Sequence, residues 1–539
     1  MRRKYMSILP IVPVLLACML GVSGCSEAEV KAEVSSLAET ESAVMEESET
    51  LESESAVMEE TEAVGAEAET PVREEQKAPQ ALAVSLITTH DYDMNDYITL
   101  ACYNFTEAAL SEKAAERLPE LSAALAKYGR ERKNAVESAY QLLLENAQKR
   151  YEELYNHERE ETGEGGYDFA MDPCVLENEI LVCRADSAVV SFLEKEVSSG
   201  GPASADVVYR GVAFDAETGQ RLELSDVITD VSVLPESLSQ ELAEYGEIPW
   251  TLGYDGITFY VGTDAPLAIT IGFMEQPEIF EERYTEVPEE YTVCFNKQEI
   301  LEFNLDGDAE LEMLQIRFTD DEWGGFSRAL ITLDGQEYLD EGYYAYQCRP
   351  YLIRANGTHY LYLDGTVEND YRVLRVYELN SEEIRPVETM WSAGVHSYYL
   401  SELVFVEELP TNPDSFVLDS RMDALSTANA GRVYHVGSDG LPEAETDYYT
   451  LNHEIMLTTK IPLTVDVINP ETGEAEAAAE ELSAGTRLIL YRTDNQTYAD
   501  LKLEDGRICR VSVDLSNGWP QLVNGRNAEE CFDGMIFAG

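Results

Sequence analysis

Positive charge is scarce in this chain. Its 539 residues include 37 Lys and Arg against 104 Asp and Glu, which gives a formal net charge of −67 at pH 7. Nucleic-acid binding depends on clustered Lys and Arg side chains that contact phosphates, so this balance argues strongly against such a function. Two interpretations of the acidity remain open. It attracts a cationic partner, or it only keeps the surface soluble.

Signatures of the common hydrolases are also absent. The six histidines form neither HExxH nor HxxEH, which removes the usual zinc-peptidase sites. GxSxG, SxxK and the P-loop pattern do not occur, so serine-hydrolase, penicillin-binding and nucleotide-hydrolase chemistry find no support. Paired carboxylates could form a glycosidase site, but in so acidic a chain their presence discriminates nothing. We expect a protein that is not an enzyme.

A long apolar segment is missing as well. The apolar run at 8–20 follows three basic residues and is too short for a transmembrane helix, which needs about 20 apolar residues. Small residues come next, and Val22-Ser23-Gly24-Cys25 resembles a bacterial lipobox. The resemblance implies cleavage of a signal peptide, residues 1–24, and a diacylglycerol on the Cys25 sulfur. The alternative is ordinary secretion, with Cys25 as an incidental thiol.

Residues 25–80 form a separate compositional unit. Residues 26–80 hold 17 Glu, no Asp and no aromatic residue, and ESAVMEE occurs twice. Such a segment buries too little apolar surface to offset its ordering entropy, so we predict a disordered linker behind the acylated cysteine. Residues 1–25 contribute +3 and residues 26–80 contribute −14, which leaves −56 for residues 81–539. Two acyl chains would hold the protein on the extracytoplasmic face of a bacterial membrane.

The pattern at 81–300 predicts an α+β domain, with helices packed on an antiparallel sheet. Residues 104–155 have apolar side chains at three- and four-residue steps, interrupted at Gly129, and predict helices. Short β-branched or aromatic runs then follow, separated by turn residues such as AETG at 216–219. These runs are VLENEILVC, AVVSFLEKEV, ADVVYRGVAFD, QRLELSDVI, ITFYVG and LAITIGF.

A family resemblance lies within these runs. RGVAFDAETGQRLELSDVI, residues 210–228, resembles the DxxTGxxLxLxDL signature of the RsiV-like (DUF3298-type) extracytoplasmic domain, and the similarity extends over about 82–295. That domain occurs in the ectodomains of anti-sigma factors, and RsiV binds lysozyme, a very basic protein. The resemblance therefore implies an envelope protein as partner. Where the family often has GGAH, this chain has Gly200-Gly201-Pro202-Ala203, so a role of that histidine is not inherited.

The rest of the chain predicts further β-structure. Residues 301–460 contain Asp-Gly turns at 305–308, 333–336, 363–366 and 438–441, which are typical of hairpins in a β-rich domain. Residues 461–539 contain short strand-like runs, TRLILYRT, YADLKLED and RICRVSVDL, with tight turns between them. They predict a small SH3-like β-barrel.

One motif has the spacing of a calcium loop. In FNLDGDAELEML, Asn304, Asp306, Asp308 and Glu312 alternate around Gly307, and they resemble the DxDGDxxxD/E loops of dockerin and integrin-type repeats. Side chains that alternate in a tight loop converge their oxygens, which suits Ca²⁺. A full EF-hand would need Glu at loop position 12, where this chain has Gln315. The alternative is an acidic β-turn without a metal.

Seven cysteines follow Cys25, and no CxxC spacing indicates a zinc site. Cys174 and Cys183 bracket CVLENEILVC, which would place them opposite each other in a hairpin that turns at Asn178-Glu179. Two interpretations stay open, a disulfide between them or two buried thiols.

Together these patterns predict a lipid-anchored protein of the bacterial cell envelope that binds or senses an envelope ligand, either a protein or peptidoglycan. An accessory cell-wall glycan hydrolase and a calcium-stabilised structural spacer are the alternatives.

Overall fold

The computed structural model describes residues 78–95, 98–162, 171–201, 205–235, 238–240, 247–262, 266–297, 300–368, 371–470, 472–476, 479–516 and 518–537. The chain divides into two units, Met1–Glu74 and Glu75–Gly539, and the described residues belong to the second. The predicted signal peptide, Cys25 and nearly all of the predicted linker therefore lie outside the described residues.

Strands dominate the structure, which is 53% strand and 15% helix. They form large sheets in which most neighbouring strands are antiparallel, and among the described residues one pair is parallel. The expectation of an α+β fold is therefore wrong, because helices form no layer comparable to the sheets. The fold is mostly β.

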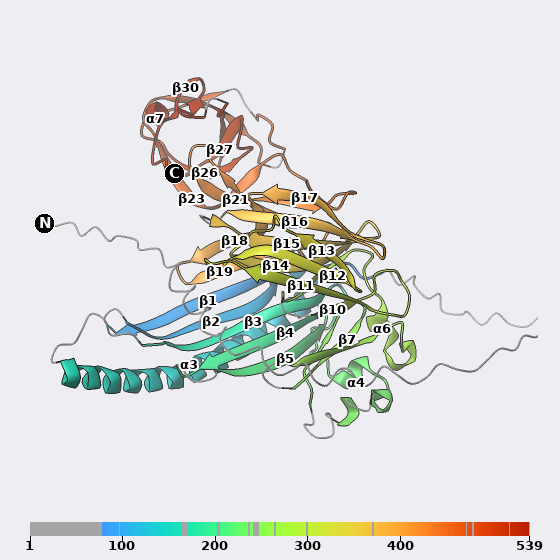
Figure 1. Ribbon diagram of the computed structural model, residues 1–539. Helices are drawn as coiled ribbons and strands as arrows, with labels where there is room; N and C mark the ends of the chain where they lie inside the picture. The colour runs from blue at the N-terminus through green and yellow to red at the C-terminus, as the bar shows by residue number, and fades with distance from the viewer. Residues whose placement is uncertain are drawn as a thin grey trace, which may run out of the picture. The chain divides into compact units, whose positions relative to one another are not determined.

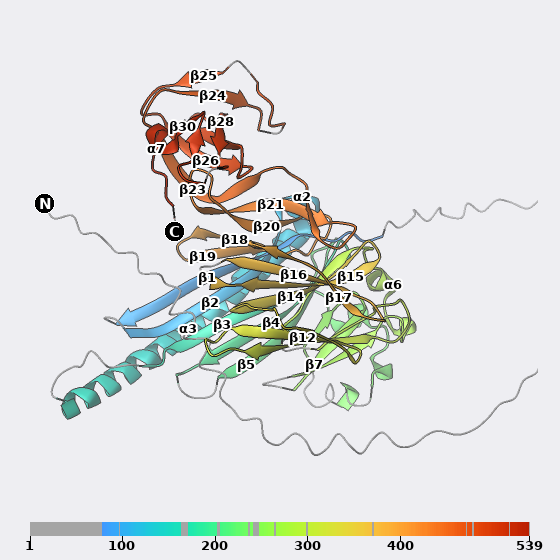
Figure 2. The ribbon, with the colours of Figure 1, turned by 45° about the horizontal axis from the view of Figure 1, so that its top comes forward.

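The first sheet has the strand order β5-β4-β3-β2-β1-β19-β18. All neighbours are antiparallel except β2 and β3, which run parallel. β1, β19 and β18 lie side by side in both views (Figures 1 and 2), and their hydrogen-bonded register agrees. The strands are β1 (Val84–Asn95), β2 (Ile98–Leu110), β3 (Cys174–Ala185), β4 (Val189–Ser199), β5 (Asp206–Asp215), β18 (Ala393–Ser401) and β19 (Val404–Glu408).

One long helix, α3 (Pro119–Thr162), lies along one face of this sheet (Figure 1). The ring of Tyr140 packs 4.9 Å from that of Tyr103 on β2. Gly129 does not interrupt the helix. A Cβ there would lie 2.2 Å from Glu107 Oε2, so its absence lets α3 approach the sheet closely. No helix among the described residues is long and apolar enough to cross a membrane.

The predicted helical region begins too early. Residues 104–110 belong to β2, where buried and half-buried side chains alternate with the period of a strand. Helix α2 (Glu112–Arg117) starts only after Ser111, whose hydroxyl accepts a hydrogen bond from the Ala114 amide. The alanine-rich composition of this stretch favours helix, but its apolar residues have the period of a strand.

A second sheet packs against the other face of the first. It has the order β17-β16-β15-β14-β9 and is itself covered by a third sheet, β10-β11-β12-β13. Strand β14 is buried on both sides. Tyr351 and Ile353 belong to the core between the first and second sheets, whereas Leu352 belongs to the core between the second and third sheets. The strands are β9 (Tyr291–Cys294), β10 (Ile300–Phe303), β11 (Glu312–Asp320), β12 (Phe326–Leu333), β13 (Gln336–Asp340), β14 (Gln347–Ala355), β15 (Thr358–Thr366), β16 (Arg372–Leu379) and β17 (Ile384–Trp391).

The Asp-Gly dipeptides have different environments. Asp334-Gly335 forms a two-residue turn between β12 and β13 with φ of 47° and 82°, as the sequence predicts. Asp364-Gly365 instead lies inside β15, paired on both sides. A Cβ on Gly365 would come within 2.9 Å of the Ala345 side chain, so tight packing accounts for that glycine.

A small three-stranded sheet follows β5. It contains β6 (Trp250–Leu252), β7 (Gly256–Val261) and β8 (Leu267–Gly272), and packs with the short helices α4 (Leu224–Val227) and α6 (Glu282–Thr285) around a separate core. The run QRLELSDVI is not a strand. Glu223 and Asp226 cap α4 reciprocally, which starts a helix there.

The C-terminal strands do not close into a barrel within the described residues, so the SH3-like barrel prediction is wrong. The predicted strand runs are present, but β23 pairs with β26 on one side and β21 on the other, which continues a larger sheet. The elements are β20 (Phe416–Met422), β21 (Ala428–Val436), β22 (Pro442–Ala444), β23 (Tyr449–Thr459), β24 (Leu463–Ile468), β25 (Glu480–Leu482), β26 (Arg487–Thr493), β27 (Tyr498–Leu503), β28 (Ile508–Asp514), β29 (Leu522–Val523), β30 (Arg526–Asn527), α7 (Ala528–Cys531) and β31 (Phe532–Asp533).

Candidate metal centre

The acidic loop predicted to bind calcium connects β10 to β11 at one end of the third sheet. Gly307 adopts a φ of +89°, a conformation that side chains other than glycine rarely tolerate, and this permits the turn. The Gly307 amide donates a 2.6 Å hydrogen bond to Asn304 Oδ1, and the Asn304 side-chain amide donates to the Asp308 carbonyl. Asn304 therefore braces the loop through both ends of its amide.

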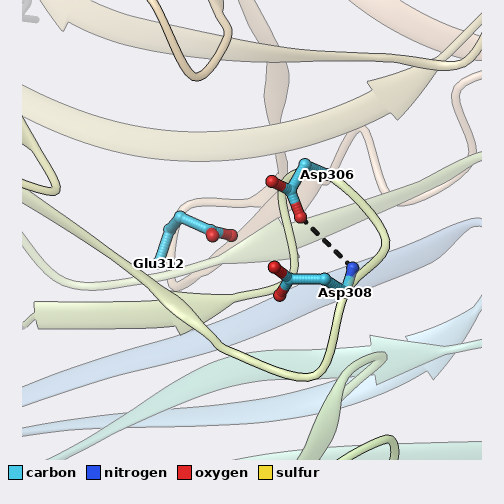
Figure 3. Close-up of side chains that lie close together, drawn as sticks. All are labelled: Asp306, Asp308 and Glu312. Atoms are coloured by element: carbon cyan, nitrogen blue, oxygen red, sulfur yellow. Dashed lines mark hydrogen bonds between the residues drawn. The ribbon is translucent and has the colours of Figure 1, made fainter. Parts of the chain in front are cut away.

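Three carboxylates converge inside this loop. Asp306, Asp308 and Glu312 each offer an oxygen, and these atoms all lie within 4.8 Å of one another. Figure 3 shows the Glu312 carboxylate turned toward the two aspartates from across the loop. Burial and the neighbouring Asp306 charge raise the pKa of Glu312. The structure thus brings together three of the four predicted residues.

Each of these carboxylates also holds the backbone. Asp306 Oδ1 accepts from the Asp308 amide at 3.2 Å, Asp308 Oδ1 accepts from Glu310 at 2.7 Å, and Glu312 Oε2 accepts from Leu305 at 2.6 Å. Those contacts leave further carboxylate lone pairs for a cation. Calcium prefers such hard oxygen ligands in a flexible arrangement, so the donor set fits Ca²⁺.

A buried polar cluster supports the loop from the adjoining sheets. Asp255, directly before β7, receives a hydrogen bond from the Asn304 backbone, and burial raises its pKa to about 6. His359 on β15 hydrogen-bonds to the Leu305 backbone, while burial and the Arg354 charge lower its pKa to about 4. Both side chains thus contact the first residues of the acidic loop.

Tyr291 on β9 lies between the two. Its hydroxyl is 3.5 Å from His359 Nε2 and also hydrogen-bonds to Asp255. The Tyr291 ring stacks on Tyr254 at 4.1 Å between centroids, which fixes its position. We did not predict this cluster from sequence. Its members come from three separate strands or strand ends and share no local spacing, so the chain carries no short motif for it.

The predicted hairpin between Cys174 and Cys183 is wrong. Both cysteines lie in the continuous strand β3, nine positions apart, which at the usual rise of a strand is about 30 Å. That distance rules out a disulfide between them, and both side chains are thiols. The second interpretation, two buried thiols, agrees with their burial. The predicted lipidation site, Cys25, lies outside the described residues.

Comparisons with known proteins give no function for this chain. No protein-family model and no curated protein matches this chain. Several solved structures match part of it, among them two that belong to the DUF3298 family. A DUF3298 family protein from Bacteroides fragilis NCTC 9343 is 14% identical with a TM-score of 0.28, over 39% of this chain and 98% of its own. Another, from Pseudomonas aeruginosa PAO1, is 10% identical with a TM-score of 0.24, over 38% and 98%.

The matched structures are members of the family that residues 210–228 resemble. With TM-scores well below 0.5, neither likeness bears on what this chain binds.

Proposed function

We propose that this chain is a lipid-anchored, non-catalytic module of the bacterial cell envelope that binds a cationic protein. Acylation of Cys25 would hold it on the outer face of the cell membrane, and residues 26–80 would act as the spacer. The observation that carries the binding proposal is the charge of −56 on residues 81–539.

Buried ion pairs leave this net charge unchanged. Arg184 and Arg492 are buried and paired with Asp186 and Asp500 at 2.7 Å. Arg132 is largely buried and paired with Glu194. Because each of these pairs is neutral, the excess of acidic residues remains, and a basic protein meets a strongly negative chain.

The same charge favours a protein over peptidoglycan as the ligand. Cell-wall polymers carry carboxylates and phosphates, which an acidic surface repels. A basic protein gains from the field in both association rate and specificity, and it loses that gain as salt screens the field.

Retention on immobilised hen lysozyme, used as a basic probe, tests the proposal against purified wall fragments. We expect the full chain to be retained by lysozyme at about 50 mM salt and released at about 500 mM, where the screening length falls below 5 Å. Retention by wall fragments alone would contradict the choice of ligand. Retention by neither would remove the proposed binding function.

The anchor is tested independently of the ligand. We expect mass spectrometry of the native protein to find a diacylglyceryl group on Cys25 as the first residue. A Cys25→Ser variant should move from the membrane fraction to the medium. An unmodified Cys25, or recovery of the wild type from the cytosol, would contradict the anchor.

We also propose that the loop at 304–312 binds Ca²⁺ as a structural ion. The approach of three carboxylates within 4.8 Å supports this proposal. Asp306, Asp308 and Glu312 would hold the ion, whose charge would offset most of theirs and so stabilise the loop between β10 and β11. Thermal melting with and without Ca²⁺ tests it.

A further inference from the structure

One edge of the first sheet is open at the tip of β1. Strand β19 pairs with β1 only from Ser85 to Thr89, whereas β2 pairs with β1 on the other side as far as Asn95. The His90 amide still donates to the Leu403 carbonyl at 2.8 Å, and this is the last bond on that side. Within the described residues, no strand pairs with the outer edge of β1 beyond that point.

A backbone amide at this edge bonds to a local side chain instead of to a neighbouring strand. The Tyr92 amide donates to the carboxylate of Asp91 at 2.8 Å, so a local side chain takes the position that a partner strand's carbonyl would occupy. An extended segment can therefore pair here without breaking any bond of the β1–β2 ladder.

Apolar side chains surround the open edge. Tyr92 and Met94 on β1 are each 48% exposed. Nearby, the end of β18 exposes Tyr399 and Leu400 by 68% and 69%, and the β18–β19 turn exposes Leu403 by 45%. The register places the two groups at the same end of the sheet, because Leu403 contacts His90. A gathering of large exposed apolar side chains marks an interaction surface.

The charges at this tip are acidic. Asp91 and Glu402 are exposed, and Asp93 is half-buried, where it accepts a hydrogen bond from the Tyr140 hydroxyl. Two copies of this chain paired edge to edge would bring these carboxylates together, which disfavours a second copy as the occupant. The same carboxylates attract Lys and Arg side chains.

We propose that the outer edge of β1, from His90 to Asn95, accepts an extended segment of a cationic protein as an added strand. Apolar residues of that segment contact Tyr92 and Leu403, and its basic residues contact Asp91 and Glu402. This inference rests on the proposed binding of a basic protein and names where that protein docks.

A synthetic peptide of eight residues that alternates Lys and Val is the probe, with a Glu/Val peptide as its charge-reversed control. We expect the full chain to bind the Lys/Val peptide by fluorescence anisotropy, and binding to slow amide hydrogen exchange at residues 90–95. Absence of binding, or protection only elsewhere, would overturn the proposal. Equal binding of the chain to the Glu/Val peptide would also overturn it. Stronger retention of the chain on phosphatidylglycerol vesicles than on the Lys/Val peptide would do the same.

Two variants of the edge separate it from the acidic surface as a whole. Tyr92→Pro removes the outward amide while leaving the ladder to β2 intact, and we expect about tenfold weaker peptide binding, the effect of losing one well-placed hydrogen bond and its geometry. Asp91→Asn with Glu402→Gln should weaken binding about fivefold at low salt and little at high salt. Glu382→Gln with Glu383→Gln, on an exposed turn elsewhere, removes the same charge and should leave binding nearly unchanged.

The lysozyme experiment then distinguishes the two proposals. If the wild type binds lysozyme and both edge variants bind it equally well, the docking edge is wrong and the proposed function stands. If the wild type binds no basic protein, the proposed function fails.

Discussion

Asp255 and His359 contact consecutive residues of the acidic loop, Asp255 at the Asn304 backbone and His359 at the Leu305 backbone. Their pKa values are displaced in directions that have opposite effects on stability. The pKa of Asp255 rises to about 6 because burial disfavours its charged form, and that of His359 falls to about 4 for the same physical reason.

The pH dependence of stability should therefore differ between variants of these two residues. The contribution of Asp255 is complete below about pH 4 and is lost as the pH rises through 6, whereas that of His359 is complete above about pH 6.5 and is lost as the pH falls through 4. Each pKa is displaced by roughly two units, which corresponds to on the order of 2–3 kcal/mol of stability. In the wild type the two contributions change in opposite directions with pH and offset each other.

Urea denaturation between about pH 4 and 7 measures this difference. Relative to wild type, Asp255→Asn should gain stability as the pH rises, and His359→Gln should lose it. Glu382→Gln, an exposed control, should follow the wild-type curve. Parallel curves for all four proteins would show that the two pKa displacements are absent.

Calcium should stabilise the folded chain through the loop at 304–312. At a free concentration about 100 times the dissociation constant, one bound ion adds about 2.7 kcal/mol to the free energy of unfolding, which calorimetry would register as a higher melting temperature. Asp306→Asn and Glu312→Gln should abolish this rise. Asp439→Asn alters the exposed aspartate of another Asp-Gly turn and should retain it. A melting temperature that is equal in Ca²⁺ and in EGTA would contradict the site.

Gly211→Ala should destabilise the protein severely. Gly211 lies on β5, and a Cβ there would fall 1.7 Å from the Trp250 carbonyl oxygen on β6, a backbone atom that cannot move aside without shifting the small sheet. We expect a loss above about 3 kcal/mol, the range of severe overpacking. Gly200→Ala is the matched control, because nothing lies within 4 Å of its added Cβ. Equal chemical denaturation midpoints for both variants would contradict this packing.

Arg184→Met should cost about 3–5 kcal/mol because it leaves a buried charge without its partner. The Arg184 guanidinium is fully buried, pairs with Asp186 and donates to the carbonyls of Tyr284 and Glu286. Adding Asp186→Asn should recover part of the loss in denaturant titrations. Lys127→Met breaks an exposed pair with Glu131 and should cost less than about 0.5 kcal/mol. A similar cost for both single variants would contradict the role of burial.

The sequence predicted local patterns better than their assembly. The runs that became β3, β4, β5, β7 and β8 were identified from β-branched and aromatic residues. The sequence predicts a turn at Asn178, but the side-chain amide of Asn178 bonds both the amide and the carbonyl of Thr106 on the neighbouring strand. The sequence alone does not reveal such a contact, because it does not show which strand lies next to Asn178.

The candidate site shows the same division. Regular spacing within one loop identified Asp306, Asp308 and Glu312, because the loop alone brings them together. Asp255 and His359 reach the loop only through the packing of separate sheets, so no spacing in the sequence predicts their contact with it. Residues 461–539 predicted strands correctly, but closure of a barrel depends on which strands pair, and β23 pairs outward with β21.

Strand β18 changes neighbours midway: Ala393–Val395 bond to β20, and His396–Ser401 bond to β19. This short strand is therefore shared between the first sheet and the sheet of the C-terminal strands. Melting either group would unravel the ladder of the other, so the two should lose structure in a single cooperative step. In evolution, exchange of the C-terminal strands for another module would have to preserve this shared strand.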